Sequence, residues 1–330
     1  MRLVRGSRPA LSGTMTAIVP KVTSMRLTFA IAALILLLPP SAMAGQLRFG
    51  VAAIGHGLVL HYAEEGAGPL VIFVHGSLSQ MNYWQEQVPA FAARHYRAIA
   101  YSRRYNPPNH NPARAGYSAI ADAQDLAAFI HTLHLGRVYV VGHSYGALTA
   151  LYLAIRHPEL LRAVVLAEPP AIPLLEDVTG PGRARARALY TDIQARMVEP
   201  MQKDFRAHHD AAGVAAFIDY VFADPTAWTH RFSAADRAEM LGNAHEWDVM
   251  MTDGTLFPPL SARDVAQIRV PVLVMSGAKS YPFLRIIDRY LAHHIPGAEA
   301  VTYANAGHQM WYTDARQARA ATLAFFASHP

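Results

Sequence analysis

The sequence predicts an α/β protein in which helices flank a mostly parallel sheet. Two observations support this fold class. Short apolar runs alternate with helical patterns along most of the 330-residue chain, which is typical of a parallel sheet covered by helices. The strand patterns then disappear over residues 171–261, where only helical patterns remain. We therefore expect a core formed by residues 45–170 and 262–330, with a helical lid at 171–261 over the carboxyl edge of the sheet, where ligands bind in open α/β folds.

Buried strands are predicted wherever a short apolar run is bounded by turn residues. The first of them is LVIFVHG, which ends in a glycine. Helical patterns, with apolar residues three or four positions apart, separate these runs. The expected strands lie at residues 70–76, 96–102, 138–142, 161–169, 270–277 and 298–308, and the expected core helices at 83–94, 119–135 and 147–158.

The expected lid consists of helices, whose patterns cover residues 183–198, 211–222 and 233–247. In the third helix, Ser233 is followed three residues later by Asp236, which is the spacing of an N-cap and its partner. The stretch GPGRARARA at the start of the first helix is rich in arginine. We interpret it as a solvated helix start rather than a binding segment.

The N-terminus differs from the rest of the chain. Basic residues precede the apolar run LTFAIAALILLL, two prolines and the small-residue segment SAMA, which is the pattern of a secretory signal peptide at residues 1–44. Met25 is an alternative start. A membrane span needs about 20 apolar residues, and this run is shorter. We expect an exported, periplasmic or secreted protein with no stable membrane span after cleavage, and an uncleaved anchor stays open.

Composition argues against several classes of function. The chain has a formal charge of +5, and basic residues that precede residue 45 account for all of this excess. The charge therefore gives no reason to expect a nucleic-acid partner. There is no cysteine, hence no disulfide and no thiolate metal site. The pairs His208-His209 and His293-His294 lack a third ligand at suitable spacing. We therefore expect no metal and no cofactor, and a small-molecule substrate.

The strongest chemical signal is the pentapeptide Gly142-His143-Ser144-Tyr145-Gly146. It directly follows an expected strand and directly precedes an expected helix, which is the context of a nucleophile elbow. Such a turn is too sharp for side chains at the two glycine positions. We expect the serine hydroxyl at the sheet edge, beside helix-end N–H groups that can meet an anion.

Two other segments provide partners for this serine. His75-Gly76 closes an earlier strand, and the N–H of Ser77 can pair with that of Tyr145 to form an oxyanion hole. His308 follows the last expected strand, late in the chain as the order serine, acid, histidine requires.

Together these segments resemble the α/β-hydrolase superfamily. The resemblance covers residues 47–326, with the lid as its least constrained part. It implies a sheet of eight mostly parallel strands, with Ser144 as nucleophile and His308 as base. In most members the catalytic acid is an aspartate in a Gly-x-x-Asp setting after the strand at 270–277. This sequence reads Gly277-Ala278-Lys279-Ser280 there, so a serine replaces the expected carboxylate.

Glu168 is the best replacement for the missing aspartate. It follows the strand after the nucleophile helix, and some branches of the superfamily, including certain haloalkane dehalogenases, resemble this arrangement with a glutamate as the acid. The acid would orient the histidine and stabilise its charged form. Asp248, Asp264 and Asp288 are weaker candidates, because none of them directly follows an apolar strand.

The resemblance implies a serine hydrolase acting on an ester, lactone or similar carbonyl substrate. Ser144 stands where dehalogenases and epoxide hydrolases carry an aspartate, which favours acyl transfer over an alkyl-enzyme. Two alternatives stay open. One is carbon–carbon bond hydrolysis or cofactor-free perhydrolysis on the same residues, and the other is a non-catalytic ligand-binding protein on a hydrolase scaffold. We expect Arg103 and Arg104 to be solvated or ion-paired rather than to contact substrate.

Overall fold

Residues 46–330 are described by the computed structural model, and the predicted signal peptide at 1–44 lies outside them. The strands are β1 (Arg48–Gly55), β2 (Leu58–Glu65), β3 (Leu70–Val74), β4 (Arg97–Tyr101), β5 (Val138–His143), β6 (Leu161–Ala167), β7 (Val272–Gly277) and β8 (Glu299–Tyr303). They form an 8-stranded sheet in the order β1-β2-β4-β3-β5-β6-β7-β8. β1 and β2 are antiparallel to their neighbours and the other pairs are parallel, so the predicted sheet is confirmed.

The parallel strands form because their apolar runs are buried on both faces of the sheet. Successive side chains point to opposite faces. In β3, Ile72 and Val74 pack into one hydrophobic cluster, whereas Val71 and Phe73 pack into the other. A sheet of this kind needs helices on both faces, which is what the alternating sequence pattern predicts.

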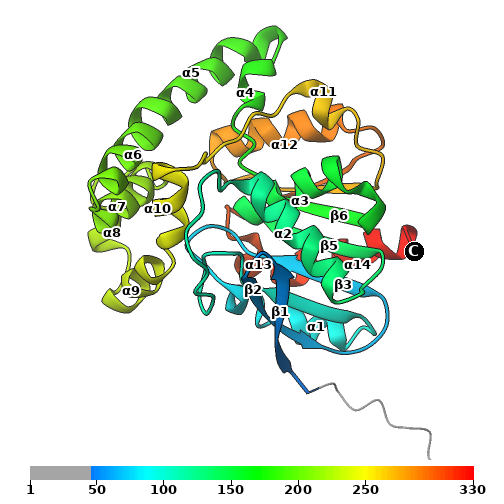
Figure 1. Cartoon of the computed structure of the whole chain (residues 1–330). Helices are drawn as coiled ribbons and strands as arrows, with labels where there is room; N and C mark the ends of the chain where they lie inside the picture. Colours follow the sequence, from blue (N-terminus) through cyan, green and yellow to red (C-terminus); the bar gives the residue numbers. More distant parts are fainter. Residues whose placement is uncertain (1–45) are drawn as a thin grey trace, which may run out of the picture. The chain divides into compact units, whose positions relative to one another are not determined.

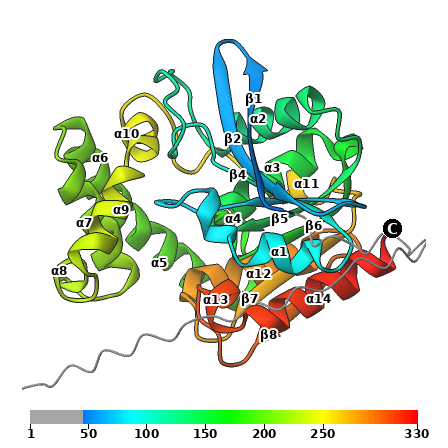
Figure 2. The same cartoon turned by 90° about the horizontal axis from the view of Figure 1, so that it is seen from below.

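Helices cover both faces of the sheet (Figures 1 and 2). One face packs against α2, α3 and α12, and the other against η1, α1, α13 and α14. The helices of the α/β core are η1 (Met81–Trp84), α1 (Gln87–Ala92), α2 (Ala119–Thr132), α3 (Tyr145–Arg156), η2 (Pro158–Leu160), α12 (Pro282–His294), α13 (Met310–Thr313) and α14 (Ala315–Ser328).

Within residues 46–330, none of the helices combines the length and apolarity that crossing a membrane requires.

The segment between β6 and β7 is helical, and helices α5 to α10 gather at one side of the α/β core (Figure 1). Ser233 caps α9 as predicted: its Oγ accepts a hydrogen bond of 3.1 Å from Asp236 N, and its own N–H donates to the Asp236 carboxylate at 2.9 Å. That this insertion acts as a lid stays a prediction. Its elements are α4 (Leu174–Asp177), η3 (Gly180–Gly182), α5 (Arg183–Ile193), η4 (Gln194–Val198), α6 (Glu199–Arg206), α7 (Asp210–Val221), α8 (Ala227–His230), α9 (Ala234–Gly242), α10 (His245–Thr252) and α11 (Ala262–Val265).

Hydrogen bonds tie the segment after α10 to the core. The Tyr145 hydroxyl donates to the carbonyl of Leu256 at 3.1 Å, and the Tyr152 hydroxyl donates to that of Pro258 at 2.8 Å. Both tyrosines belong to α3, the helix that follows the nucleophile elbow. The returning chain therefore runs along α3, close to the predicted site.

Candidate active site

Ser144 occupies a strained turn between β5 and α3. Its backbone has φ 54° and ψ −124°, a left-handed φ that costs free energy for a residue other than glycine. Its N–H donates to the carbonyl of Ala167 at the end of β6, at 2.9 Å. The residue is only half-buried, so the strand, the helix and the neighbouring strand present its hydroxyl at the carboxyl edge of the sheet.

The two flanking glycines are required by close backbone approaches. A Cβ added at Gly142 would lie 2.6 Å from Ala147 Cα, and one added at Gly146 would lie 2.5 Å from the His75 carbonyl oxygen. Cβ atoms do not come this close to backbone atoms, so a side chain at either position would push the elbow apart. The glycine spacing thus follows from the sharpness of the turn.

His308 and Glu168 are joined by a hydrogen bond. His308 Nδ1 lies 2.6 Å from Glu168 Oε2, and the glutamate side chain is fully buried while that of the histidine is 16% exposed. Because a carboxylate oxygen only accepts, His308 Nδ1 carries the hydrogen, and its Nε2 is left to act as the base. This is the arrangement expected of the acid and base of a triad.

Ser280 and Gly277 also donate hydrogen bonds to the Glu168 carboxylate. The Ser280 hydroxyl donates to Glu168 Oε2 at 2.6 Å, and the Gly277 N–H donates to Oε1 at 2.7 Å. The carboxylate therefore accepts three hydrogen bonds in a buried place, which fixes its orientation toward His308. The serine that replaces the usual aspartate is in direct contact with the glutamate.

In the described part of the chain, the side chains of Ser144 and His308 are not joined by a hydrogen bond, although the His143 ring next to Ser144 lies 4.6 Å from the His308 ring. Within residues 46–330, the only hydrogen bond of the His308 ring is the one to Glu168. Hydrogen bonds between a catalytic base and its nucleophile often tighten only when substrate binds. The pairing of His308 with Glu168 is thus formed, whereas a hydrogen bond between His308 and Ser144 is not formed among the described residues.

His143 is a residue of this site to which sequence reasoning gave no role. It is buried between Gly142 and Ser144, and its Nε2 donates to the His308 carbonyl at 2.8 Å. Its ring also stacks on Tyr83, with ring centroids 5.2 Å apart. Burial lowers the pKa of His143 well below its usual value, so the ring stays neutral. The only available signal was its place within the pentapeptide.

The expected oxyanion loop, defined here as residues 75–78 and called the oxyanion loop below, lies directly against Ser144. A Cβ added at Gly76 would be 3.0 Å from Ser144 Cβ. Ser77 follows Gly76 in the loop after β3, and Tyr145 is the first residue of α3, where backbone N–H groups have no partner inside the helix. The two N–H groups proposed from the sequence therefore belong to segments that flank Ser144 on either side.

Comparison with protein families agrees with this geometry. A family model described as the alpha/beta hydrolase fold matches residues 69–197, which include the oxyanion loop, the nucleophile elbow and Glu168. Residues 69–197 are therefore similar to the α/β-hydrolase superfamily, and the sheet of the described residues has the corresponding fold. The match ends before His308, which is assigned to the site from its hydrogen bond alone.

Similar curated proteins include hydrolases that act on epoxides. Bifunctional epoxide hydrolase 2 of Sus scrofa is 29% identical over 163 residues, which is 49% of this chain. An epoxide hydrolase of Caballeronia sordidicola is 36% identical over 110 residues, which is 33% of this chain. The matched regions span only 29% and 33% of these two relatives' own length.

Solved structures extend the likeness to nearly the whole described fold. The enol-lactonase from Burkholderia xenovorans LB400 superimposes with a TM-score of 0.64 at 21% identity, and the alignment covers 84% of this chain and 99% of that one. At this identity the likeness shows the fold, and the chemistry has to be argued from the site itself.

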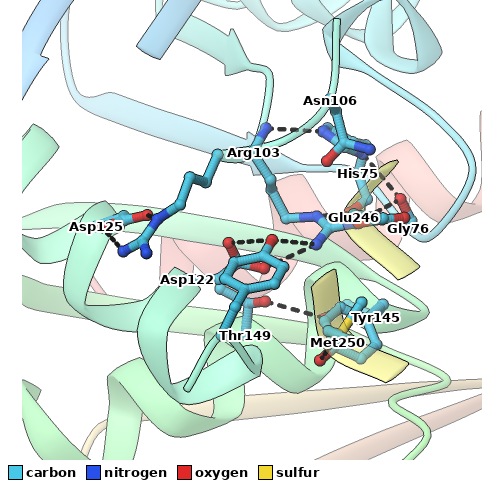
Figure 3. A network of polar contacts seen from close by, with 12 residues as sticks. His75, Gly76, Arg103, Asn106, Asp122, Asp125, Tyr145, Thr149, Glu246 and Met250 are labelled. Carbon is cyan, nitrogen blue, oxygen red and sulfur yellow. Dashed lines mark hydrogen bonds and ion pairs between the residues drawn. The ribbon is translucent and has the colours of Figure 1, made fainter. Parts of the chain in front are cut away.

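Arg103 and Arg104 are ion-paired inside the protein, and Figure 3 shows Arg103 with its partners Asp122 and Glu246. Arg103 pairs with Asp122 at 2.7 Å and with Glu246, and all three side chains are buried. Arg104 donates two hydrogen bonds of 2.6 Å to Asp125. Carboxylates thus neutralise both guanidinium groups, in agreement with the ion-paired expectation. Sequence reasoning missed Glu246, which lies in the helical insertion.

The aromatic residues of the insertion pack mainly on one another. Phe217 contacts Trp247 with ring centroids 4.6 Å apart, and Phe222 contacts Phe232 at 5.5 Å. Nearer the site, the Tyr281 ring lies 5.6 Å from that of His308. No group of three or more histidine, aspartate or glutamate side chains in the described part of the chain is placed to hold a metal ion.

Proposed function

We propose that this chain is a serine hydrolase that cleaves an ester, lactone or similar carbonyl substrate through an acyl-enzyme on Ser144. The observation that carries the proposal is the 2.6 Å hydrogen bond between Glu168 and His308. A binding protein on a hydrolase scaffold would have no use for a buried carboxylate aimed at this ring. A buried charge is costly unless hydrogen bonds compensate it, and here the compensation includes the histidine.

In the first half of the reaction, His308 Nε2 accepts the hydroxyl proton as Ser144 Oγ attacks the carbonyl carbon. The carbonyl oxygen becomes an anion and accepts hydrogen bonds from the N–H groups of Ser77 and Tyr145. His308 then gives its proton to the leaving oxygen, and the carbon–oxygen bond breaks. The acyl group remains as an ester on Ser144.

In the second half, water attacks this ester and gives a proton to His308. The bond to Ser144 Oγ breaks, Ser144 regains its proton, and the acid product leaves. Throughout, Glu168 keeps the hydrogen on Nδ1 and stabilises the imidazolium that forms in each half. In this scheme Ser280 acts only through Glu168.

The test is the hydrolysis of a panel of activated esters and lactones by the wild type and by Ser144→Ala. We expect turnover by the wild type and its loss in the variant, with unchanged folding by circular dichroism. A phosphonate or fluorophosphonate probe should label the wild type at Ser144 and leave the variant unlabelled. Equal activity of the two proteins would rule out the acyl-enzyme on Ser144.

The proposal also includes export through residues 1–44 and a covering role for the insertion at 171–261. Export is supported by the order of basic, apolar and small residues at the N-terminus. It is tested by expressing the full chain and determining the N-terminus and the fraction in which the protein is found. An N-terminus near Gly45 in the periplasm or medium is expected, and an intact leader in the membrane fraction would instead indicate an anchor.

A further inference from the structure

Both peptide groups next to Ser77 are held by one buried ion pair. The Leu78 N–H donates to Glu246 Oε1 at 2.9 Å, and the Gly76 carbonyl accepts from an Arg103 guanidinium nitrogen at 3.1 Å. The same nitrogen of Arg103 donates to the other carboxylate oxygen of Glu246. Arginine and glutamate therefore form a single unit that bridges the residues on either side of the oxyanion donor. Figure 3 shows Arg103 with Glu246 and Gly76.

The preceding residue of the oxyanion loop is fixed by the same arginine. Arg103 Nε donates to the His75 carbonyl at 3.2 Å, and the Arg103 backbone N–H donates to His75 Nε2 at 3.0 Å. Asp122 completes the unit from α2, 2.7 Å from the guanidinium. Burial lowers the pKa of Arg103, but the charges of Glu246 and Asp122 outweigh burial and raise that pKa well above its usual value. The arginine is thus charged while it holds the loop.

The unit matters because Glu246 is its only member from the helical insertion. Glu246 lies on α10, whereas the oxyanion loop, Arg103 and Asp122 all belong to the α/β core. One turn further along the same helix, Met250 Sδ lies 3.0 Å from the Tyr145 hydroxyl oxygen, whose hydrogen is shared with the Leu256 carbonyl. The same helix therefore contacts Tyr145, one expected oxyanion donor, and Leu78, the residue that follows the other donor.

We propose that Glu246, acting through Arg103 and Leu78, is a positioning residue of the oxyanion hole and makes its geometry depend on the position of α10. The inference rests on the proposed serine-hydrolase function. It implies that the hole is correctly formed only while α10 is seated on the core. A displacement of the insertion would release the Leu78 N–H and leave Arg103 with one carboxylate fewer, so the Ser77 N–H would lose its fixed direction.

The neighbouring pair Arg104–Asp125 provides a matched control. It also joins the loop after β4 to α2, it is largely buried, and it is held by two hydrogen bonds of 2.6 Å. It makes no hydrogen bond to residues 75–78 among the contacts of the described residues. Asp125→Asn therefore removes a comparable ion pair without touching the oxyanion loop.

The experiment compares Glu246→Gln, Glu246→Ala and Asp125→Asn with the wild type on one activated ester. Because a donor misplaced by about 1 Å can cost on the order of a hundredfold in rate, we expect both Glu246 variants to lose about tenfold to a hundredfold in kcat. KM should change little, and Glu246→Ala should lose more than Glu246→Gln, which keeps an acceptor for Leu78. Asp125→Asn should keep kcat close to the wild-type value.

A pair of inhibitors separates positioning from stability. A trifluoromethyl ketone adds to the serine and places an oxyanion in the hole, whereas the matching methyl ketone binds without this addition. We expect the Glu246 variants to weaken the trifluoromethyl ketone by the same factor as kcat and to leave the methyl ketone nearly unaffected. Parallel losses of kcat in the Glu246 variants and in Asp125→Asn would overturn the proposal, and so would a lower melting temperature with unchanged kcat.

Hydrogen exchange of the peptide that contains residues 75–78 tests the inference without any substrate. Exchange there should accelerate in Glu246→Ala and stay at the wild-type rate in Asp125→Asn. If the wild type hydrolyses none of the esters or lactones and this selective acceleration is still seen, the proposed function fails while the loop-holding role of Glu246 stands. Unchanged exchange in Glu246→Ala overturns the inference, whatever the activity.

Discussion

The Ser280 hydroxyl donates to Glu168 at 2.6 Å, so the residue at the usual acid position contacts the carboxylate that we assign as the acid. The contact follows from the sheet: β6 and β7 are adjacent and parallel, with Ala167 paired to Met275, and their carboxyl ends lie side by side. A glutamate after β6 can therefore point at the same histidine as an aspartate after β7. Its longer side chain makes the reach possible.

Replacing Glu168 by glutamine should remove most of the activity. Glutamine has one acceptor oxygen and one NH2 group in place of the two carboxylate oxygens. If the oxygen accepts from the Gly277 N–H, the NH2 group faces His308 Nδ1 and cannot accept its hydrogen, so the required tautomer is disfavoured. We expect kcat to fall by roughly a thousandfold to ten-thousandfold. The measurement is steady-state hydrolysis of an activated ester, together with the melting temperature.

Asp264→Asn is the control for that variant, because Asp264 is a carboxylate that the sequence alone left open as the acid. In the structure it caps α11, where its oxygen accepts from Ser261 N at 2.9 Å. This variant should retain its activity. Loss of activity in Asp264→Asn with retention in Glu168→Gln would show that the acid has been assigned wrongly.

Replacing Ser280 by alanine should have a much smaller effect. The variant loses one of the hydrogen bonds to Glu168, while those from Gly277 and His308 remain. A hydrogen bond to a charged group contributes about 1.5 to 3 kcal/mol, so we expect kcat to fall by roughly tenfold to a hundredfold. Rates on the same ester check this, and a rise in KM at constant kcat would mean that Ser280 contacts substrate instead.

The parts of the site that sequence predicts well are local in the chain. The nucleophile elbow depends on a strand, two glycines and a helix within one short stretch, and these patterns are visible without tertiary contacts. Glu168 could be proposed because it directly follows an apolar strand. The helical insertion was also visible, because periodicity and the Ser233 cap are local features.

The parts that sequence could not provide depend on contacts between distant segments. Glu246 lies in a helical pattern between His245, which is exposed, and Trp247, which is buried, and nothing in that pattern marks it as buried. Its burial depends on Arg103, which is 143 residues away in the chain. The same holds for Ser280, whose hydrogen bond to Glu168 requires two strands to be neighbours.

Replacing Gly146 by alanine should destabilise the fold and remove activity. The added Cβ would meet the His75 carbonyl at 2.5 Å, so either the elbow or the oxyanion loop must shift. Such overpacking costs about 1 to 3 kcal/mol of unfolding free energy. Gly242→Ala in α9 is the control: its Cβ meets nothing within 4 Å, and alanine should stabilise the helix by up to about 1 kcal/mol. Urea denaturation checks both, and equal stabilities would contradict the close-approach argument.

The buried ring of His143 should make stability depend on pH. In the unfolded chain a histidine has a pKa of about 6.5, whereas burial and the nearby His308 lower the pKa of His143 in the folded protein. Below about pH 6.5 the unfolded state therefore binds a proton that the folded state does not, and stability falls as pH falls.

His143→Phe isolates this contribution, because phenylalanine can keep the stacking on Tyr83 but has no proton to bind. Other titrating groups, including the buried His75, are present in both proteins, so their effects largely cancel in the difference. Between about pH 6.5 and about pH 5.5 the wild type should lose up to about 1 kcal/mol more unfolding free energy than the variant. Urea denaturation at several pH values measures this difference. If the two proteins lose stability in parallel over this range, then His143 takes up a proton in the folded state and is not the neutral donor to the His308 carbonyl.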